Sequence, residues 1–185
     1  MIININLLNV LIWNVLNEVN MKSNIKKVLI MYYSKSGNTK KLAEEIANGV
    51  RLVKSIKCII KSTSEIKKED FLSADAIIAG SPVYFGTMAS ELKQVFERFV
   101  GLRKNMGDKI GAAFSTSADD FGGNETTINS IIQAMLIYGM IIVGDPLDAS
   151  GHYGVSCVGA PNKKTIQNAK KLGKRVAELL KKLKD

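Results

Sequence analysis

Residues 27–39 read KVLIMYYSKSGNT, an apolar run that passes through small hydroxyl residues and a glycine into an amphipathic segment. This pattern predicts a strand, a tight turn at Gly37 and a helix that begins close to Thr39. The first amides of a helix lack partners within the helix, and the helix dipole favours negative charge at that end. Because the hydroxyls of Ser36 and Thr39 lie beside these amides, the turn is typical of a phosphate-binding site.

Two other phosphate-binding patterns are absent from the sequence. Neither the Walker pattern, which ends in Gly-Lys-Ser/Thr, nor the Gly-x-Gly-x-x-Gly dinucleotide fingerprint occurs. Nucleoside triphosphate chemistry and a separate Rossmann site are therefore disfavoured. The alternative interpretation of residues 34–39 is a plain strand-to-helix turn in which Ser36 or Asn38 caps the helix.

The composition indicates one globular domain with an ample core. The chain has 185 residues, of which 46% are hydrophobic and 23% charged. Its net charge is +9, and most of the excess lysines lie on predicted helix surfaces, so we expect solvated lysines and no nucleic-acid partner. Cys58 and Cys157 form no Cys-x-x-Cys pair, which argues against a metal site and favours a reducing, cytoplasmic location.

Residues 1–20 differ in composition from the rest of the chain. They consist mainly of Ile, Leu, Val and Asn, with Glu18 as the one charged residue. They lack the basic start and the cleavage site of a signal peptide, and asparagines interrupt every apolar run, so no membrane span is expected. We expect residues 1–20 to be an extension outside the fold and residues 21–185 to form the domain.

The remaining chain alternates short apolar runs with amphipathic segments. This alternation predicts an α/β domain, a parallel sheet with helices on both faces. The expected strands are residues 27–33, 56–61, 75–80, 109–115 and 140–144. Ligands of such sheets bind outside the carboxyl ends of the strands, where the strand order reverses.

Residues 34–39 resemble the phosphate loop of the flavodoxin-like flavoproteins, where Ser-x-Ser/Thr-Gly-Asn-Thr holds the terminal phosphate of FMN. Three later segments are similar, in order and spacing, to the WrbA branch, the NAD(P)H:quinone oxidoreductases. They are SPVYFGTM at 81–88, FSTS and GGNETT within 114–127, and YGMIIVG at 138–144. The resemblance implies a flavodoxin-like, doubly wound, five-stranded parallel sheet of order 2-1-3-4-5 and FMN as the cofactor.

The expected FMN contacts come from the loops after the first, third and fourth strands. A flavin needs a phosphate site, a flat apolar slot and backbone donors at the ring edge. The phosphate contacts are expected from Ser34, Lys35, Ser36, Gly37, Asn38 and Thr39. The ring contacts are expected from Pro82, Val83, Tyr84, Phe85, Gly86, Ser115, Thr116, Ser117, Phe121, Gly122 and Gly123. For Tyr84 and Phe85 the alternative is packing in the core. Tyr84 also stands where the family often has Arg, so a flavin-directed charge is missing there.

The resemblance also implies residues on the substrate side of the flavin. Tyr138 stands where the WrbA family commonly has a His beside the flavin of a neighbouring subunit, which implies a catalytic contact and a homo-oligomer. His152 and Tyr153 lie in a loop similar to the family's loop beside the substrate face, and Arg103 matches a substrate-side position. The alternatives are a surface-loop histidine and an ordinary loop cation.

The reaction that the resemblance implies is reduction of FMN by NAD(P)H, followed by reoxidation by a quinone or a similar small molecule. Without a dinucleotide fingerprint the two substrates would share one slot over the flavin, which predicts ping-pong kinetics. The main alternative is a one-electron carrier of the flavodoxin type. Such carriers are typically acidic, so the charge of +9 favours the enzyme. A nucleic-acid-binding module, the third alternative, lacks any recognition motif.

Overall fold

The computed structural model describes residues 25–183, so the expected extension of residues 1–20 lies outside the described part. Seven strands and five helices follow one another, with one 3₁₀ helix. The strands are β1 (Lys26–Tyr32), β2 (Ile56–Ser62), β3 (Ala76–Tyr84), β4 (Thr87–Met88), β5 (Ile110–Ser117), β6 (Ile141–Ile142) and β7 (Val155–Val158). The helices are α2 (Asn38–Arg51), α3 (Lys68–Ser73), α4 (Ser90–Arg98), η1 (Val100–Asn105), α5 (Asn124–Ile137) and α6 (Lys163–Lys182).

The sheet has the order β2-β1-β3-β5-β6, and β4 and β7 pair with β3 and β5. All pairs are parallel except β3 with β4. This arrangement confirms the doubly wound order 2-1-3-4-5, with β5 and β6 as the predicted fourth and fifth strands. Tyr32 pairs with Gly80, and Gly80 pairs with Phe114. The carboxyl ends of the three central strands therefore lie at the same edge.

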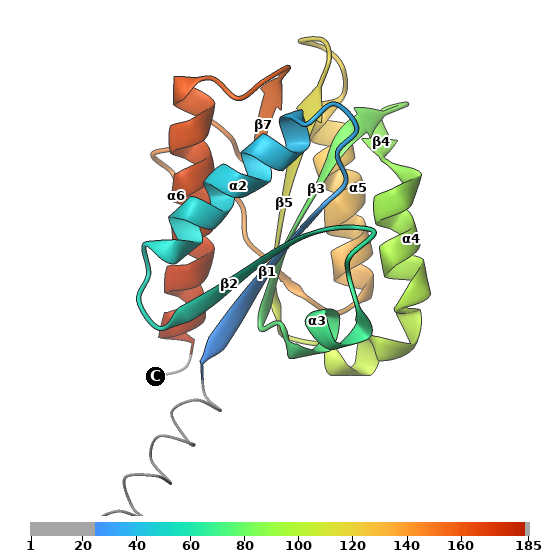
Figure 1. The fold of residues 1–185 in the computed structure, drawn as a ribbon, viewed down its shortest axis with the longest axis vertical. Coiled ribbons are helices and arrows are strands. Elements are labelled where there is room, and N and C mark those ends of the chain that lie inside the picture. Colours follow the sequence, from blue (N-terminus) through green and yellow to red (C-terminus); the bar gives the residue numbers. More distant parts are fainter. Residues whose placement is uncertain (1–24, 184–185) are drawn as a thin grey trace, which may run out of the picture.

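Helices cover both faces of the sheet (Figure 1). One core joins the sheet to α2 and α6, and the other joins it to α3, α4 and α5. Two glycines allow α2 and α6 to approach closely. A Cβ atom on Gly49 would lie 2.0 Å from the Lys170 carbonyl oxygen, and one on Gly173 would lie 2.1 Å from that of Ile46.

Two strands differ from the sequence-based expectation. β3 does not end at residue 80 but runs to Tyr84, where it turns into a hairpin with β4. Of the expected strand 140–144, only β6 forms, and it pairs with the start of β5. After residues 143–154, β7 pairs with the second half of β5. Pro146 lies in this interruption, and a proline has no amide to donate to a neighbouring strand.

The two cysteines lie far apart across the sheet. Cys58 belongs to β2 at one edge, and Cys157 belongs to β7, which pairs with β5 toward the other edge. Both are free thiols, and burial raises the pKa of Cys157 to about 11. Among the helices of residues 25–183, none is long and apolar enough to cross a membrane. The cytoplasmic location stays a prediction.

Candidate functional site

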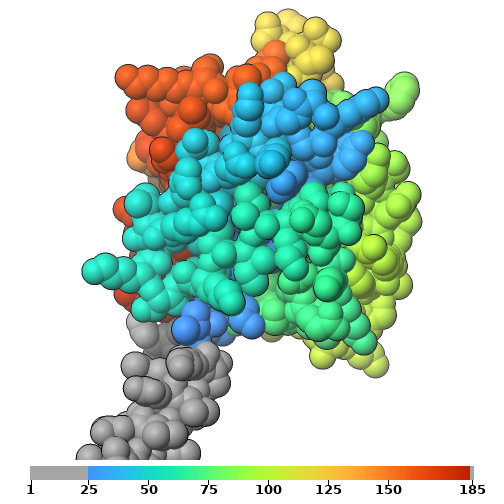
Figure 2. Space-filling model, in the orientation of Figure 1, coloured from blue at the N-terminus to red at the C-terminus, as the bar shows by residue number. Residues whose placement is uncertain are grey.

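Three loops meet at the carboxyl edge of the sheet, and we call this meeting point the three-loop site. They are residues 33–38 before α2, the turn between β3 and β4, and residues 118–123 before α5. The Thr39 and Thr116 hydroxyl oxygens lie 2.8 Å apart. A Cβ atom on Gly123 would lie 3.2 Å from the Cα atom of Gly86. In Figure 2 the blue, light-green and yellow atoms of these segments lie at the top and upper right of the molecule.

The loop at residues 33–38 leaves helix amides open to a ligand. Gly37 has φ 92°, a left-handed conformation that a side chain would strain, and it lies immediately before α2. The Ser34 hydroxyl oxygen accepts hydrogen bonds from the Gly37 and Lys40 amides, at 3.1 and 3.2 Å. Within the described part of the chain, the amides of Asn38 and Thr39 have no acceptor. These open amides fit a phosphate group at the helix N-terminus.

A buried pair of hydroxyls joins this loop to β5. Thr39 and Thr116 are both buried, and either can donate the hydrogen bond between them. A hydroxyl has one proton and two lone pairs, so the accepting member of the pair keeps its own proton for another acceptor. The pair can therefore donate to an anion beside the Asn38 and Thr39 amides. The other expected phosphate contacts, Lys35 and Ser36, are exposed in the same loop.

The hydroxyls of Ser115 and Ser117 brace the loop before α5 and do not face an opening. The Ser115 hydroxyl donates to the side-chain oxygen of Asn124 at 2.7 Å, and the Asn124 amide donates to the Ser117 oxygen at 2.8 Å. Ser117 in turn donates to the Asp119 carbonyl at 2.8 Å. Both serines are buried and their hydroxyls are used within this loop, so the ring contact expected from Ser115 and Ser117 stays a prediction that their backbone would have to meet. Asn124 was not predicted as a site residue from the sequence, although its position directly after Gly122 and Gly123 was a signal for a role in this loop.

The turn between β3 and β4 carries a fully exposed aromatic side chain. Phe85 has φ 50° and Gly86 has φ 74°, so the two-residue turn is of the I′ type. Phe85 is fully exposed, which excludes packing in the core, whereas the Tyr84 ring meets Tyr33 edge-on at 6.2 Å between centroids. Ser81 supports the turn by accepting a hydrogen bond from the Ala89 amide at 2.8 Å. Pro82 and Val83 lead into it, half-buried.

The left-handed conformation of Phe85 leads us to expect that replacing this residue changes the stability of the protein. Asn tolerates this conformation better than Phe, so Phe85→Asn is expected to stabilise the FMN-free protein by about 1 kcal/mol and to raise its Tm by about 2–4 °C. FMN binding is expected to weaken because an exposed aromatic side chain beside the flavin is lost. Thermal unfolding and FMN titration measure the two effects.

Phe121→Asn is the matched control for this substitution. Phe121 is fully exposed on the neighbouring loop but is not among the residues with positive φ. Its replacement should leave the Tm of the FMN-free protein unchanged. If Phe85→Asn also left the Tm unchanged, or lowered it, the turn would not be strained by Phe85.

The structure places Tyr138 and Arg103 away from the three-loop site. Tyr138 follows α5 and precedes β6, whose partner Ile110 begins β5, so both residues lie at the amino edge of the sheet. The Tyr138 side chain is buried, and its hydroxyl donates to the Phe96 carbonyl. Arg103 donates to the Ile137 carbonyl at 2.9 Å. Within its own chain the Tyr138 hydroxyl is already used inside the core, and the catalytic contact with the flavin of a neighbouring subunit stays a prediction.

Tyr138→Phe is expected to lower stability without affecting the flavin. The hydroxyl satisfies a carbonyl in the last turn of α4, so its loss should cost about 1 kcal/mol. FMN affinity and the rate of flavin reduction should stay unchanged. Denaturant unfolding and stopped-flow reduction test both statements, and a slower reduction at unchanged stability would support the predicted catalytic contact.

His152 and Tyr153 lie beside β5 rather than at the three-loop site. They precede Val155, which pairs with Phe114, so their loop runs along the middle of β5. Both side chains are exposed. The same loop buries Asp145, whose two carboxylate oxygens have no hydrogen-bond partner within the described part of the chain. Burial raises the pKa of Asp145 to about 6, although Arg175 and His152 oppose the shift.

Comparison with known proteins decides the family. Residues 61–153, about half of the chain, match the family described as NADPH-dependent FMN reductase. The chain belongs to this family. Among curated relatives, an NAD(P)H dehydrogenase (quinone) of Archaeoglobus fulgidus is 32% identical and covers 85% of this chain and 98% of its own length. A flavodoxin of Aquifex aeolicus is 36% identical, over 82% of this chain and 85% of its own length.

A solved structure supports the same fold. The flavodoxin-like, WrbA-like protein of Agrobacterium tumefaciens superimposes with a TM-score of 0.74. The superposition covers 85% of this chain and 98% of that protein, at 19% identity. The chain thus has the flavodoxin-like fold and is an FMN flavoprotein of the FMN reductase family, with FMN as its cofactor. The open amides and hydroxyl pair of the three-loop site fit the phosphate of this cofactor.

Proposed function

We propose that this FMN reductase family member transfers electrons from NAD(P)H to a quinone or a similar small acceptor by a ping-pong mechanism. Bound at the three-loop site, FMN would supply the redox chemistry, which is acceptance of a hydride from NAD(P)H and transfer of the two electrons to the acceptor. The observation that carries the proposal is the three-loop site, where the Asn38 and Thr39 amides have no acceptor among the described residues. The relatives of the chain include an NAD(P)H dehydrogenase (quinone), which supports the same reaction.

The residues of the chain would hold and expose the cofactor. The Asn38 and Thr39 amides and the Thr39–Thr116 hydroxyl pair would bind its phosphate. The backbone of the turn at Gly86 and of the loop at Gly122 and Gly123 would meet the ring edge. Phe85 and Phe121, which belong to these two loops, are fully exposed. Both substrates would therefore reach the flavin from the solvent side, one after the other.

An electron carrier is the second candidate, because the flavodoxin of Aquifex aeolicus is similar over most of the chain. A carrier docks on protein partners and needs no site for a nicotinamide. The net charge of +9 argues for the enzyme, since flavodoxin carriers are typically acidic.

Initial-rate kinetics test the proposed mechanism. With NAD(P)H varied at several fixed concentrations of a soluble quinone, the double-reciprocal lines are expected to be parallel. A shared slot requires the oxidised nicotinamide to leave before the quinone binds. Intersecting lines would mean that both substrates bind together, which would contradict the shared slot.

A further inference from the structure

An open groove adjoins the three-loop site on the outer side of the loop at residues 33–38. It has a volume of about 810 Å³, in the range of nucleotide-sized ligand sites. It lies between residues 33–40, residues 62–64 and one side of α4, and we call it the α4 groove. Its lining includes Tyr33, Lys35, Ser64, Glu91, Gln94 and Arg98.

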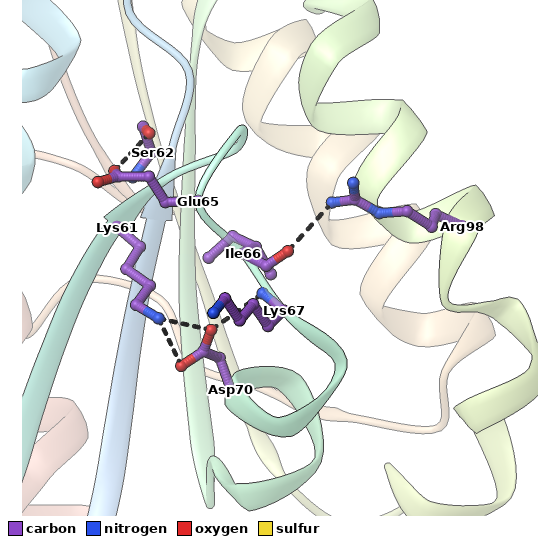
Figure 3. A network of polar contacts seen from close by, with 7 residues as sticks. All are labelled: Lys61, Ser62, Glu65, Ile66, Lys67, Asp70 and Arg98. Carbon is purple, nitrogen blue, oxygen red and sulfur yellow. Dashed lines mark hydrogen bonds and ion pairs between the residues drawn. The ribbon is translucent and has the colours of Figure 1, made fainter.

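The groove is open because α3 is short. α3 has six residues and lies at the lower end of the sheet in Figure 1, so no helix covers the carboxyl end of β2 beside α4. The wall opposite α4 is nevertheless held firmly (Figure 3). Lys61 donates to both carboxylate oxygens of Asp70, at 2.7 and 2.8 Å, and Arg98 reaches across to the Ile66 carbonyl at 3.4 Å. These contacts fix the segment that follows β2, next to the groove.

The groove borders the three-loop site. Tyr33 lines it, and the ring of Tyr33 contacts Tyr84 of the turn between β3 and β4. Ser34, Lys35 and Gly37 line it from the outer side of the loop whose inner end carries the Thr39–Thr116 pair. One elongated ligand can thus have one end at the flavin and the other end in the groove.

The chemistry of the lining suits a nucleoside phosphate. Lys35 and Arg98 provide positive charge from opposite walls, and neither forms a salt bridge among the described residues. Tyr33 offers an aromatic ring for a base. The Glu91 carboxylate already accepts a hydrogen bond from the Ser90 hydroxyl at 3.1 Å and has lone pairs left for ribose hydroxyls; a hydrogen bond from its own amide holds its pKa below the usual value. Glu97 is already paired with Lys93.

We propose that the α4 groove binds the adenylate half of NAD(P)H while the nicotinamide half reaches the flavin. The inference rests on the proposed function, in which NAD(P)H is the reductant. The groove would thus bind the dinucleotide in a chain whose sequence lacks the Gly-x-Gly-x-x-Gly fingerprint. Phosphates would lie near Lys35 and Arg98, the base near Tyr33 and the ribose near Glu91.

A bulky substitution in the groove tests the proposal on the FMN-loaded full chain. Gln94 is exposed on α4 and forms no side-chain hydrogen bond among the described residues, so Gln94→Trp fills the groove without breaking a contact. The KM for NADPH is expected to rise about tenfold or more. The rate with reduced nicotinamide mononucleotide, which lacks the adenylate half, should not change. Gln133→Trp, on α5 and outside the groove, is the matched control, because Gln133 is also exposed and forms no side-chain hydrogen bond among the described residues; it should change neither.

A direct titration separates this inference from the proposed function. ADP and 2′,5′-ADP should bind the wild-type holoprotein in calorimetry and should bind Gln94→Trp about tenfold more weakly or not at all. If neither NADPH nor reduced nicotinamide mononucleotide reduced the flavin, the proposed function would fail. The titration with ADP compounds would then still show whether the α4 groove binds an adenylate group. An unchanged KM for NADPH, equal effects on NADPH and on the mononucleotide, or no binding of either ADP compound would overturn the inference.

Discussion

The double substitution Ser36→Ala/Thr39→Ala is expected to weaken FMN binding by about 10²- to 10⁴-fold. Each hydroxyl would donate a charge-assisted hydrogen bond to the phosphate, worth roughly 1.5–3 kcal/mol. Thr39 is buried beside Thr116, so its bond would form in a site from which water is largely excluded. Fluorescence titration of the FMN-free protein with FMN measures the loss.

The conservative double substitution Ser36→Thr/Thr39→Ser is the matched control. It keeps both hydroxyls and should retain most of the affinity. Thermal unfolding of both FMN-free variants shows whether the fold is intact, because Thr39→Ala also removes a bond to Thr116. Unchanged FMN affinity in the alanine variant would place the phosphate elsewhere.

Asp145→Asn is expected to stabilise the protein at pH 8 and to leave its stability at pH 4 unchanged. The pKa of Asp145 is about 6 in the folded protein, above its ordinary value of 3.8, because burial penalises the charged carboxylate. The folded state therefore binds this proton more tightly, and stability falls as the pH rises from about 4 through about 6. The full loss is about 3 kcal/mol, or roughly 6–12 °C in Tm.

Thermal unfolding between pH 4 and pH 8 measures this effect. Arg175 of α6 and His152 of the same loop face the carboxylate and oppose the shift. Asp148→Asn is the matched control, since Asp148 lies in the same loop but is exposed and pairs with Lys171 at 2.8 Å. Equal pH dependence in the wild type and Asp145→Asn would mean that Asp145 is ionised and satisfied in the folded protein.

The central strands could be predicted from the sequence because burial on both faces produces continuous apolar runs. The expected strand 27–33 corresponds to β1 at Lys26–Tyr32, and 109–115 corresponds to β5 at Ile110–Ser117. The edge strand could not be predicted equally well, because its interruption at Pro146 and its return as β7 depend on pairing with β5. The hairpin after β3 was also hidden, since Phe85 is not a typical turn residue.

The turn at Gly37 and the start of α2 were predictable because their signal is local, in the residues around Gly37. Side-chain directions set by distant partners were not predictable. Ser115 and Ser117 turn toward Asn124, and the Tyr138 hydroxyl turns toward Phe96, which lies 42 positions earlier in the chain. The α4 groove was likewise hidden, because it results from a short helix and from two loops that meet only in the folded chain.

Anaerobic mixing of the FMN-loaded protein with NADPH or NADH tests the central claim most directly. If NAD(P)H reaches the flavin at the three-loop site, the visible absorbance of the bound flavin should be bleached in a single turnover, and a soluble quinone should then restore it. An electron carrier has no nicotinamide site and would react poorly with either dinucleotide. A flavin that stays oxidised with both NADH and NADPH, yet is reduced by dithionite, would contradict the account.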